Sequence, residues 1–169
     1  FLLNPSQEDQ LDAIYGDGEL IEGFAKNKYY YAYTLPVGAD HIPVLTWDPT
    51  DIWQTVTTDT VLSTSIKQIT QIHVVAGSGK KNTYTVAYEI MLSDVDTLKQ
   101  IYVGADTLEG YNAYTTEYYV YLAAGDSVAP AVAWLEGDAY QSIIPTTVAH
   151  IINGEQIGWK TTLTVVAQD

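Results

Sequence analysis

The sequence contains an internal repeat with a spacing of 87 residues. Residues 21–38 read IEGFAKNKYYYAYTLPVG, and residues 108–125 read LEGYNAYTTEYYVYLAAG. When residues 11–54 are placed over residues 98–141 without a gap, 12 of the 44 positions are identical. A repeat of this length indicates a duplicated folding unit, with each copy built from the same supersecondary elements.

The spacing of the repeat changes further along the chain. The VVA segment at residues 74–76 matches the VVA segment at residues 165–167 at a spacing of 91, so the second copy carries four additional residues. The segment NTYTVAYEI (residues 82–90) has no counterpart after Asp169. We therefore expect the second copy to lack its closing strand and to expose a sheet edge.

These matches predict how the chain is divided. Residues 1–3 lie 87 positions before residues 88–90, so the first residues are interpreted as the tail of a preceding repeat. The predicted divisions are a tail and linker at residues 1–10, a first repeat at residues 11–92, a linker at residues 93–97 and a second, C-terminally incomplete repeat at residues 98–169.

Residue types and turn signals predict short β-strands in each copy. The chain has 14 Tyr and 4 Trp but only one Met, and aromatic and β-branched residues suit a pleated, half-buried surface. GDGE (residues 16–19) predicts a tight turn, and residues 67–90 predict two strands around a glycine-rich hairpin loop. About seven strands per repeat, without helical periodicity, predict an all-β fold of two tandem immunoglobulin-like β-sandwiches.

One aromatic strand in each copy is expected to turn the same face to the core, because strand side chains alternate. The residues predicted to share this face are Tyr31, Tyr33 and Leu35 in the first copy and Tyr118, Val120 and Leu122 in the second. Tyr119 and Tyr121 then fall on the opposite face. Trp47 and Trp134 recur at matching positions, which predicts a core role in each sandwich.

The charge balance disfavours two classes of partner. The chain has 21 Asp and Glu against 7 Lys and no Arg, for a net charge of −14. Such a surface repels phosphate backbones and anionic membranes, so we expect no nucleic-acid partner. No run of 18 apolar residues is present, and we expect no direct membrane insertion.

The sequence has no set of residues typical of an active site, so we predict that the chain is not an enzyme and holds no cofactor. AGSGKKNT (residues 76–83) lacks the spacing of a phosphate-binding loop and is interpreted as a hairpin turn. The three histidines have no metal-ligand spacing, and there is no cysteine. Asp94, Asp96 and Asp106 lie near the joint between the repeats; solvated turn carboxylates are expected there, with bound Ca²⁺ as the alternative.

The order of motifs resembles that of the tandem cadherin-like, immunoglobulin-like β-sandwich repeats of Bacteroidetes surface proteins and lipoproteins. The motifs are L-x-x-I, (I/L)-E-G-(F/Y), an aromatic strand ending in L-P-x-G, P-x-x-x-W, V-V-A and T-Y-T-V. In the first copy they are Leu11 to Ile14, Ile21 to Phe24, Leu35 to Gly38, Pro43 to Trp47, Val74 to Ala76 and Thr83 to Val86. The second copy departs from the pattern at Ala123, which replaces the proline of the first copy.

The resemblance implies a non-catalytic spacer or adhesion module on the bacterial outer surface, anchored through regions outside these 169 residues. Its expected partners are neighbouring repeats, with a glycan or another surface protein as further candidates. The alternative is a carbohydrate-binding module. In that interpretation Tyr119, Tyr121 and Trp159 form an aromatic platform, because flat aromatic rings stack on sugar rings.

Overall fold

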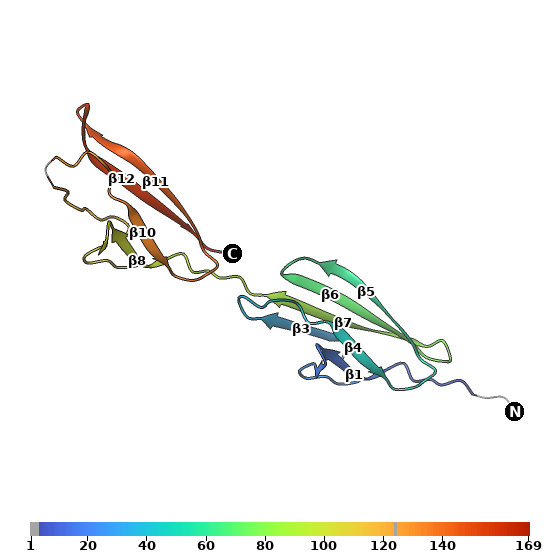
Figure 1. Cartoon of the computed structure of the whole chain (residues 1–169). Helices are drawn as coiled ribbons and strands as arrows, with labels where there is room; N and C mark the ends of the chain where they lie inside the picture. Colours follow the sequence, from blue (N-terminus) through green and yellow to red (C-terminus); the bar gives the residue numbers. More distant parts are fainter. Residues whose placement is uncertain (1–3, 124) are drawn as a thin grey trace. The chain divides into compact units, whose positions relative to one another are not determined.

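The computed structural model describes residues 4–123 and 125–169, and this part of the chain is all-β, with twelve strands and no helix. The chain divides into two compact units, Phe1–Met91 (unit 1) and Leu92–Asp169 (unit 2), each with its own sheets (Figure 1). The predicted all-β class is confirmed, and the paired sheets are consistent with a β-sandwich in unit 1.

The smaller sheet of unit 1 has the strand order β2-β1-β4. Its strands are β1 (Leu11–Gly16), β2 (Glu19–Leu20) and β4 (Leu45–Pro49). Asp17 and Gly18 connect β1 to β2 with φ angles of 51° and 85°, which form a two-residue hairpin turn that suits Gly and Asp. The tight turn predicted from GDGE is confirmed.

The larger sheet of unit 1 has the order β3-β7-β6-β5. Its strands are β3 (Tyr30–Leu35), β5 (Thr55–Ser63), β6 (Lys67–Val75) and β7 (Lys81–Ile90). β7 lies inside the sheet, parallel to β3 on one side and antiparallel to β6 on the other. The larger sheet therefore depends on β7 to join β3 to the β5–β6 hairpin.

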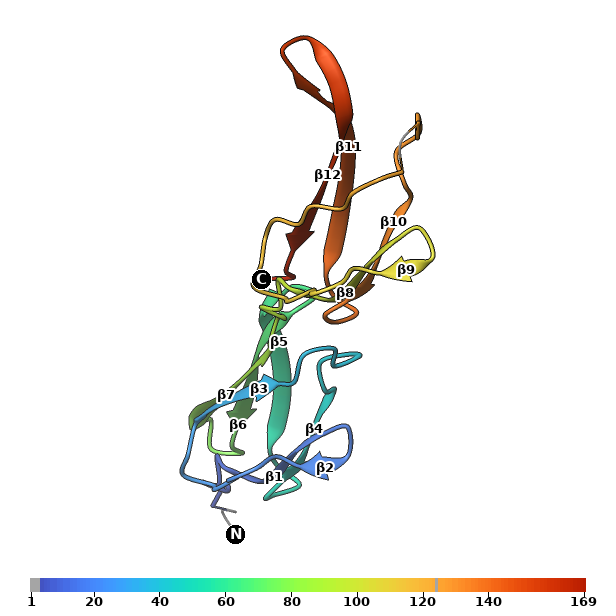
Figure 2. The ribbon, with the colours of Figure 1, turned by 90° about the vertical axis from the view of Figure 1, so that its left-hand side faces the viewer.

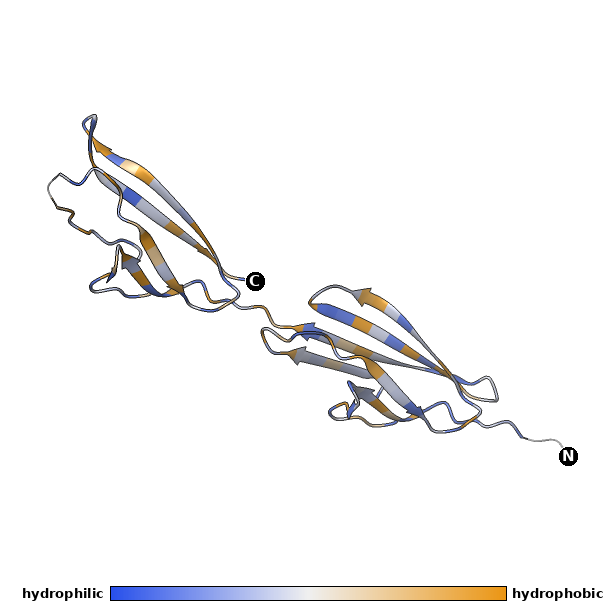
Figure 3. Ribbon diagram, in the orientation of Figure 1, coloured by the Kyte–Doolittle hydropathy of each residue, from blue (hydrophilic) through white to orange (hydrophobic). Residues whose placement is uncertain are grey.

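The core of unit 1 lies between these two sheets. Figure 3 shows hydrophobic and hydrophilic residues alternating along the strands, as expected for sheets with one buried face. The buried cluster consists of Leu11, Ile14, Ile21, Tyr31, Ile72, Val74, Tyr84, Val86 and Tyr88. Trp47 packs against this cluster while remaining half-buried, which agrees with its predicted core role.

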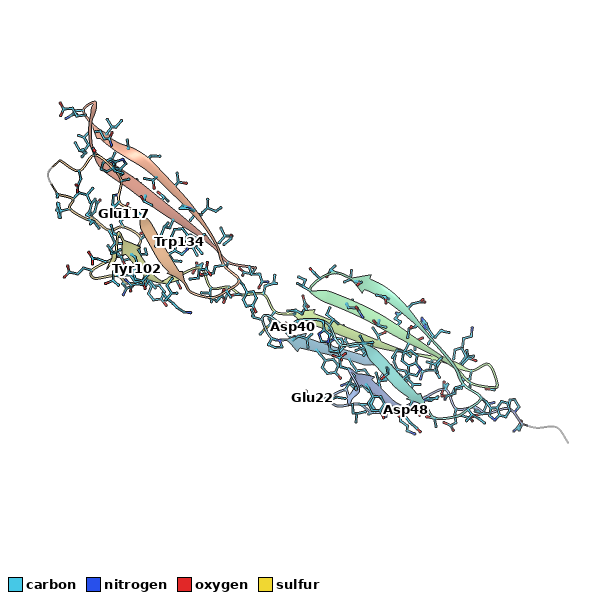
Figure 4. The ribbon with its side chains drawn as sticks, in the orientation of Figure 1. Glu22, Asp40, Asp48, Tyr102, Glu117 and Trp134 are labelled. Carbon is cyan, nitrogen blue, oxygen red and sulfur yellow. The ribbon has the colours of Figure 1, made fainter. Side chains whose placement is uncertain are left out.

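The smaller sheet of unit 2 repeats that of unit 1. Its strands are β8 (Leu98–Val103), β9 (Asp106–Thr107) and β10 (Val132–Glu136), in the order β10-β8-β9. The register is the same in both sheets, because Ile14 faces Trp47 and Ile101 faces Trp134. Trp134, labelled on β10 in Figure 4, is half-buried like Trp47.

The second sheet of unit 2 contains two strands, β11 (Ser142–Ile152) and β12 (Glu155–Val166), which form a hairpin. Asn153 and Gly154 make its turn with φ angles of 52° and 86°. The hairpin holds the four additional residues of the second copy, since Ser142 and Val166 pair as Thr55 and Val75 do in unit 1. Residues 87 positions apart before this turn, or 91 after it, are called counterparts below.

The path of the chain through unit 1 runs from one end of the unit to the other. The chain enters beside the start of β1, and β7 carries it out at the opposite end (Figures 1 and 2). Unit 2 has no strand in the position of β7 among its described residues. Its last residues lie instead beside its first, because the Gln168 N–H donates a hydrogen bond of 3.0 Å to the Ser93 carbonyl.

Candidate functional site

The two units differ most at residues 117–122, the counterpart of β3. In unit 1 all six residues of β3 pair with β7. In unit 2 residues 117–122 form no strand, and Figure 1 draws them as a coil. The prediction of a second aromatic strand here is therefore wrong, because a β-strand needs a partner for its backbone groups and the β7 position is empty of described residues.

The loss of this strand exposes side chains that the repeat predicts to be buried. Tyr31 is 1% exposed in unit 1, whereas its counterpart Tyr118 is only half-buried. Val120 and Leu122 are both exposed, so the core-facing prediction is wrong for these two residues. Without a neighbouring strand to pack against, they have no apolar surface to cover them.

Tyr118 nevertheless keeps the local contact of its counterpart. The Tyr31 hydroxyl donates a hydrogen bond of 2.9 Å to the Ala25 carbonyl and accepts one of 3.1 Å from the Ala25 N–H. The Tyr118 hydroxyl makes the same two bonds with Asn112, both at 2.7 Å. The segment that leads to residues 117–122 is thus held as in unit 1, and the difference begins after Tyr118.

A groove lies where residues 117–122 pass β8 and β9. Its volume is about 510 Å³, and its lining residues are Val103, Asp106, Thr107, Leu108, Glu109, Tyr119, Val120 and Tyr121. Tyr119 is 85% exposed and Tyr121 is 97% exposed, so both rings are available to a ligand. The two acidic residues, Asp106 and Glu109, place negative charge and hydrogen-bond acceptors beside the aromatic rings.

Trp159, the third residue of the predicted aromatic platform, does not line this groove. It lies on β12 and pairs across the hairpin with Ala149. It belongs to the alternating row of half-buried residues on β12 that continues with Thr161, Leu163 and Val165, while Lys160 between them is exposed. The structure therefore brings Tyr119 and Tyr121 to one groove and places Trp159 on the core-facing side of β12.

A glutamine holds the first segment of each unit against the turn that precedes β5 or β11. The Gln54 side chain donates hydrogen bonds of 2.8 Å to the Glu8 and Gln10 carbonyls. Its counterpart Gln141 donates bonds of 2.6 and 2.8 Å to the Val95 and Thr97 carbonyls. Sequence reasoning assigned no role to this residue, although its identity in both copies was a signal.

An aspartate in the same turn binds the start of each unit. The Ser93 hydroxyl donates a hydrogen bond to the Asp138 carboxylate and lowers the pKa of that carboxyl below its ordinary 3.8, assisted by the Tyr140 N–H. In unit 1 the hydrogen bond from the Ser6 side chain is the main cause that lowers the pKa of Asp51. Hydrogen bonds to an ionised carboxylate favour the charged form, so both aspartates are structural anions.

The acidic residues considered for Ca²⁺ are Asp94, Asp96 and Asp106, and all three are exposed. Within residues 4–123 and 125–169, no three side chains of His, Cys, Asp or Glu gather closely enough to hold a metal ion. His41 contacts Asp17 at 2.9 Å, and His73 contacts Thr83 at 3.0 Å. These contacts give the two histidines local structural partners.

Comparisons of the chain with protein-family models, curated proteins and solved structures give no match. The part of the chain that the structure describes contains no helix long and apolar enough to cross a membrane. The functional interpretation therefore depends on the repeat, on the course of the chain and on the groove of unit 2.

Proposed function

We propose that the chain is a non-catalytic cell-surface spacer or adhesion module made of tandem immunoglobulin-like repeats. It is similar in motif order to the cadherin-like repeats of Bacteroidetes surface proteins and lipoproteins. The observation that carries the proposal is the course of the chain through unit 1, from one end of the unit to the other (Figures 1 and 2). A unit with this course adds its own length to a tandem array, and the ten residues of β7 alone span about 33 Å.

The position of β7 suits a segment that transmits force. Its residues form six pairs with β3 and nine with β6, so hydrogen bonds hold it on both sides. A pull on the chain beyond β7 acts along the strand and loads both ladders together. Rupture then requires many backbone hydrogen bonds to break in one step, which slows forced unfolding.

The surface charge supports a role outside the cell. A net charge of −14 over 169 residues keeps the chain soluble and repels an anionic membrane surface. In this proposal neighbouring repeats are the direct partners, and anchoring is supplied by other regions of the protein.

Small-angle X-ray scattering of the full chain tests the spacer proposal. A compact globule of 169 residues has a radius of gyration of about 15 Å. A spacer is expected to give a value well above about 15 Å, and the value should change little between low and high salt. A radius near that of the compact globule would contradict the proposal, because the second unit would then add no reach.

A second candidate function, carbohydrate binding, is favoured by one observation. Tyr119 and Tyr121 are both highly exposed and line the same groove as Asp106 and Glu109. Aromatic rings stack on sugar rings, and carboxylates accept hydrogen bonds from sugar hydroxyl groups.

Titration calorimetry of the full chain with a panel of soluble polysaccharides and host glycans tests this candidate. The double substitution Tyr119→Ala and Tyr121→Ala should abolish any saturable heat of binding. Tyr114→Ala is the matched control, because Tyr114 is 88% exposed but does not line the groove. Binding that survives the double substitution, or no binding across the panel, would reject carbohydrate recognition at this groove.

A further inference from the structure

We propose that unit 2 is an acceptor for one additional β-strand with the side-chain pattern of β7. The acceptor site is the gap between β12 and residues 117–122, which correspond to β6 and β3 of unit 1. The strand runs antiparallel to β12 and parallel to residues 117–122, as β7 runs relative to β6 and β3. The inference concerns a binding surface and is independent of the spacer proposal.

The backbone of β12 is prepared for a second neighbour. Among the described residues β12 pairs only with β11, whereas its counterpart β6 pairs with both β5 and β7. In an antiparallel pair, alternate residues direct their N–H and C=O groups away from the partner. The free edge of β12 therefore offers a row of donors and acceptors to an incoming strand.

The side chains around the gap are also incompletely covered. Ile72 and Val74 of β6 are fully buried in unit 1, but their counterparts Leu163 and Val165 are only half-buried. Across the gap Val120 and Leu122 are exposed. A strand that fills the gap covers both sets of apolar side chains, and the burial of this surface is the main driving force for its binding.

The repeat also explains Trp159, which replaces Gln68 of β6. In unit 1 Tyr88 of β7 pairs with Gln68 and stacks on Tyr33, with ring centroids 5.2 Å apart. In unit 2 the counterpart of Tyr33 is Val120, so the large side chain has moved from the β3 side of the gap to the β12 side. A residue of the Tyr88 type in the incoming strand then packs against Trp159.

Charge complementarity defines the start of the incoming strand. Lys80, which immediately precedes β7, forms an ion pair of 3.0 Å with the buried Asp9. The counterpart of Asp9 is Asp96, which is exposed and has no ion pair within the described part of the chain. A strand that begins with lysine places its ammonium group beside Asp96, as Lys80 does beside Asp9.

The backbone next to the gap has the anchor that precedes β7 in unit 1. There the Ser78 N–H donates a hydrogen bond of 2.9 Å to the Ser6 carbonyl. The counterpart residue Asp169 donates one of 3.2 Å to the carbonyl of Ser93, which is the counterpart of Ser6. The gap is therefore open at the same point at which the hairpin of unit 1 turns into β7.

The occupant is a single peptide strand and not a folded second copy of the chain. β7 of a second copy is already held by ladders on both sides, so it could reach the gap only if unit 1 opened. The stated chemistry is a strand with lysine at its start and aromatic or branched residues at alternate positions, as in GKKNTYTVAYEI (residues 79–90).

The test is a titration of the full chain with the synthetic peptide GKKNTYTVAYEI. We expect a saturable change in tryptophan fluorescence that is strongly reduced in Trp159→Phe. Amide hydrogen exchange at residues 117–122 and on the free edge of β12 should slow by roughly tenfold or more. Asp96→Asn should weaken binding by about two- to fivefold, and high salt should reduce this difference.

The matched control peptide carries Tyr84→Ser, Val86→Ser and Tyr88→Ser, which keep its length and charge. A second arm adds a copy of residues 79–90 after Asp169, so that a weak strand is presented at roughly millimolar effective concentration. Equal binding of the two peptides, or no exchange protection in the fused chain, would overturn the proposal. Protection that appears without peptide, together with dimers in sedimentation, would overturn it as well, because a second copy would then occupy the gap.

Discussion

Units 1 and 2 have the same small sheet but differ in the sheet that faces it. The β1–β4 and β8–β10 pairs share one register, and the Gln54 and Gln141 side chains make equivalent hydrogen bonds. The larger sheet has four strands in unit 1 and two in unit 2. The small sheet and its glutamine therefore form without β7, whereas the strand conformation of β3 and full burial of the core require it.

The largest expected effect is at Tyr84, a fully buried residue of β7. Its hydroxyl donates a hydrogen bond of 2.7 Å to the Lys26 carbonyl and accepts one from the Leu11 N–H at 3.1 Å. Tyr84→Ala should lower the free energy of unfolding of unit 1 by about 3–5 kcal/mol. Urea denaturation followed by circular dichroism measures the loss.

Tyr84→Phe is the control for this substitution. It keeps the ring and removes only the two hydrogen bonds, so the expected loss is about 1–3 kcal/mol. A loss for Tyr84→Ala no larger than that for Tyr84→Phe would show that the ring of this β7 residue does not stabilise the core of unit 1.

A matched pair of substitutions on β6 and β12 compares the two cores directly. Ile72→Ala removes a fully buried side chain and should cost about 2–5 kcal/mol. Leu163→Ala removes its half-buried counterpart and should cost about 1 kcal/mol or less. Separate unfolding transitions for the two units, resolved by hydrogen exchange, provide both values. Equal losses would mean that unit 2 buries this face as completely as unit 1.

A second pair of substitutions should give equal effects. Gln54→Ala and Gln141→Ala each leave two backbone carbonyls and one N–H without their side-chain partner. Each should lower the stability of its own unit by about 1–3 kcal/mol. Exchange of the amides in that unit provides the measurement, and a loss confined to one unit would break the equivalence of the two small sheets.

The smallest effect is expected from pH, through Asp51 and Asp138. Hydrogen bonds from Ser6 and Ser93 hold the folded-state pKa of each carboxyl below 3.8. The stability that each contributes is therefore complete above the unfolded-state pKa, and it is lost as the pH falls through the lower folded-state pKa. Carboxyl NMR titration should show both shifts, and Asp51→Asn should flatten the acid dependence of unit 1 alone. An acid dependence unchanged by Asp51→Asn would assign it to other carboxyls.

Much of the fold of unit 1 could be predicted, because alternation and turn residues act over short distances. The GDGE turn and the aromatic strand ending at Leu35 follow from local sequence. The conformation of residues 117–122 could not be predicted by transfer from the first copy. A strand is stable only with a partner, and the partner of β3 lies about 50 residues further along the chain, in β7.

The candidate groove was predictable only in part. The solvent exposure of Tyr119 and Tyr121 agrees with the outward face assigned by the repeat. Their separation from Trp159 could not be read from the sequence, because it depends on which side of β12 faces the gap. Asp96 was noted as an acidic residue at the joint, but its relation to Lys80 required the observed ion pair between Lys80 and Asp9.

The longer β11–β12 hairpin has a consequence for how such duplicated units can diverge. All four additional residues lie beyond the point where the two hairpins share a register, and the turn at Asn153 and Gly154 closes the extension without altering the ladder below it. Length can therefore vary at the tip while the body of the unit is inherited unchanged. Copies of one gene segment can in this way come to present different tips on a common scaffold.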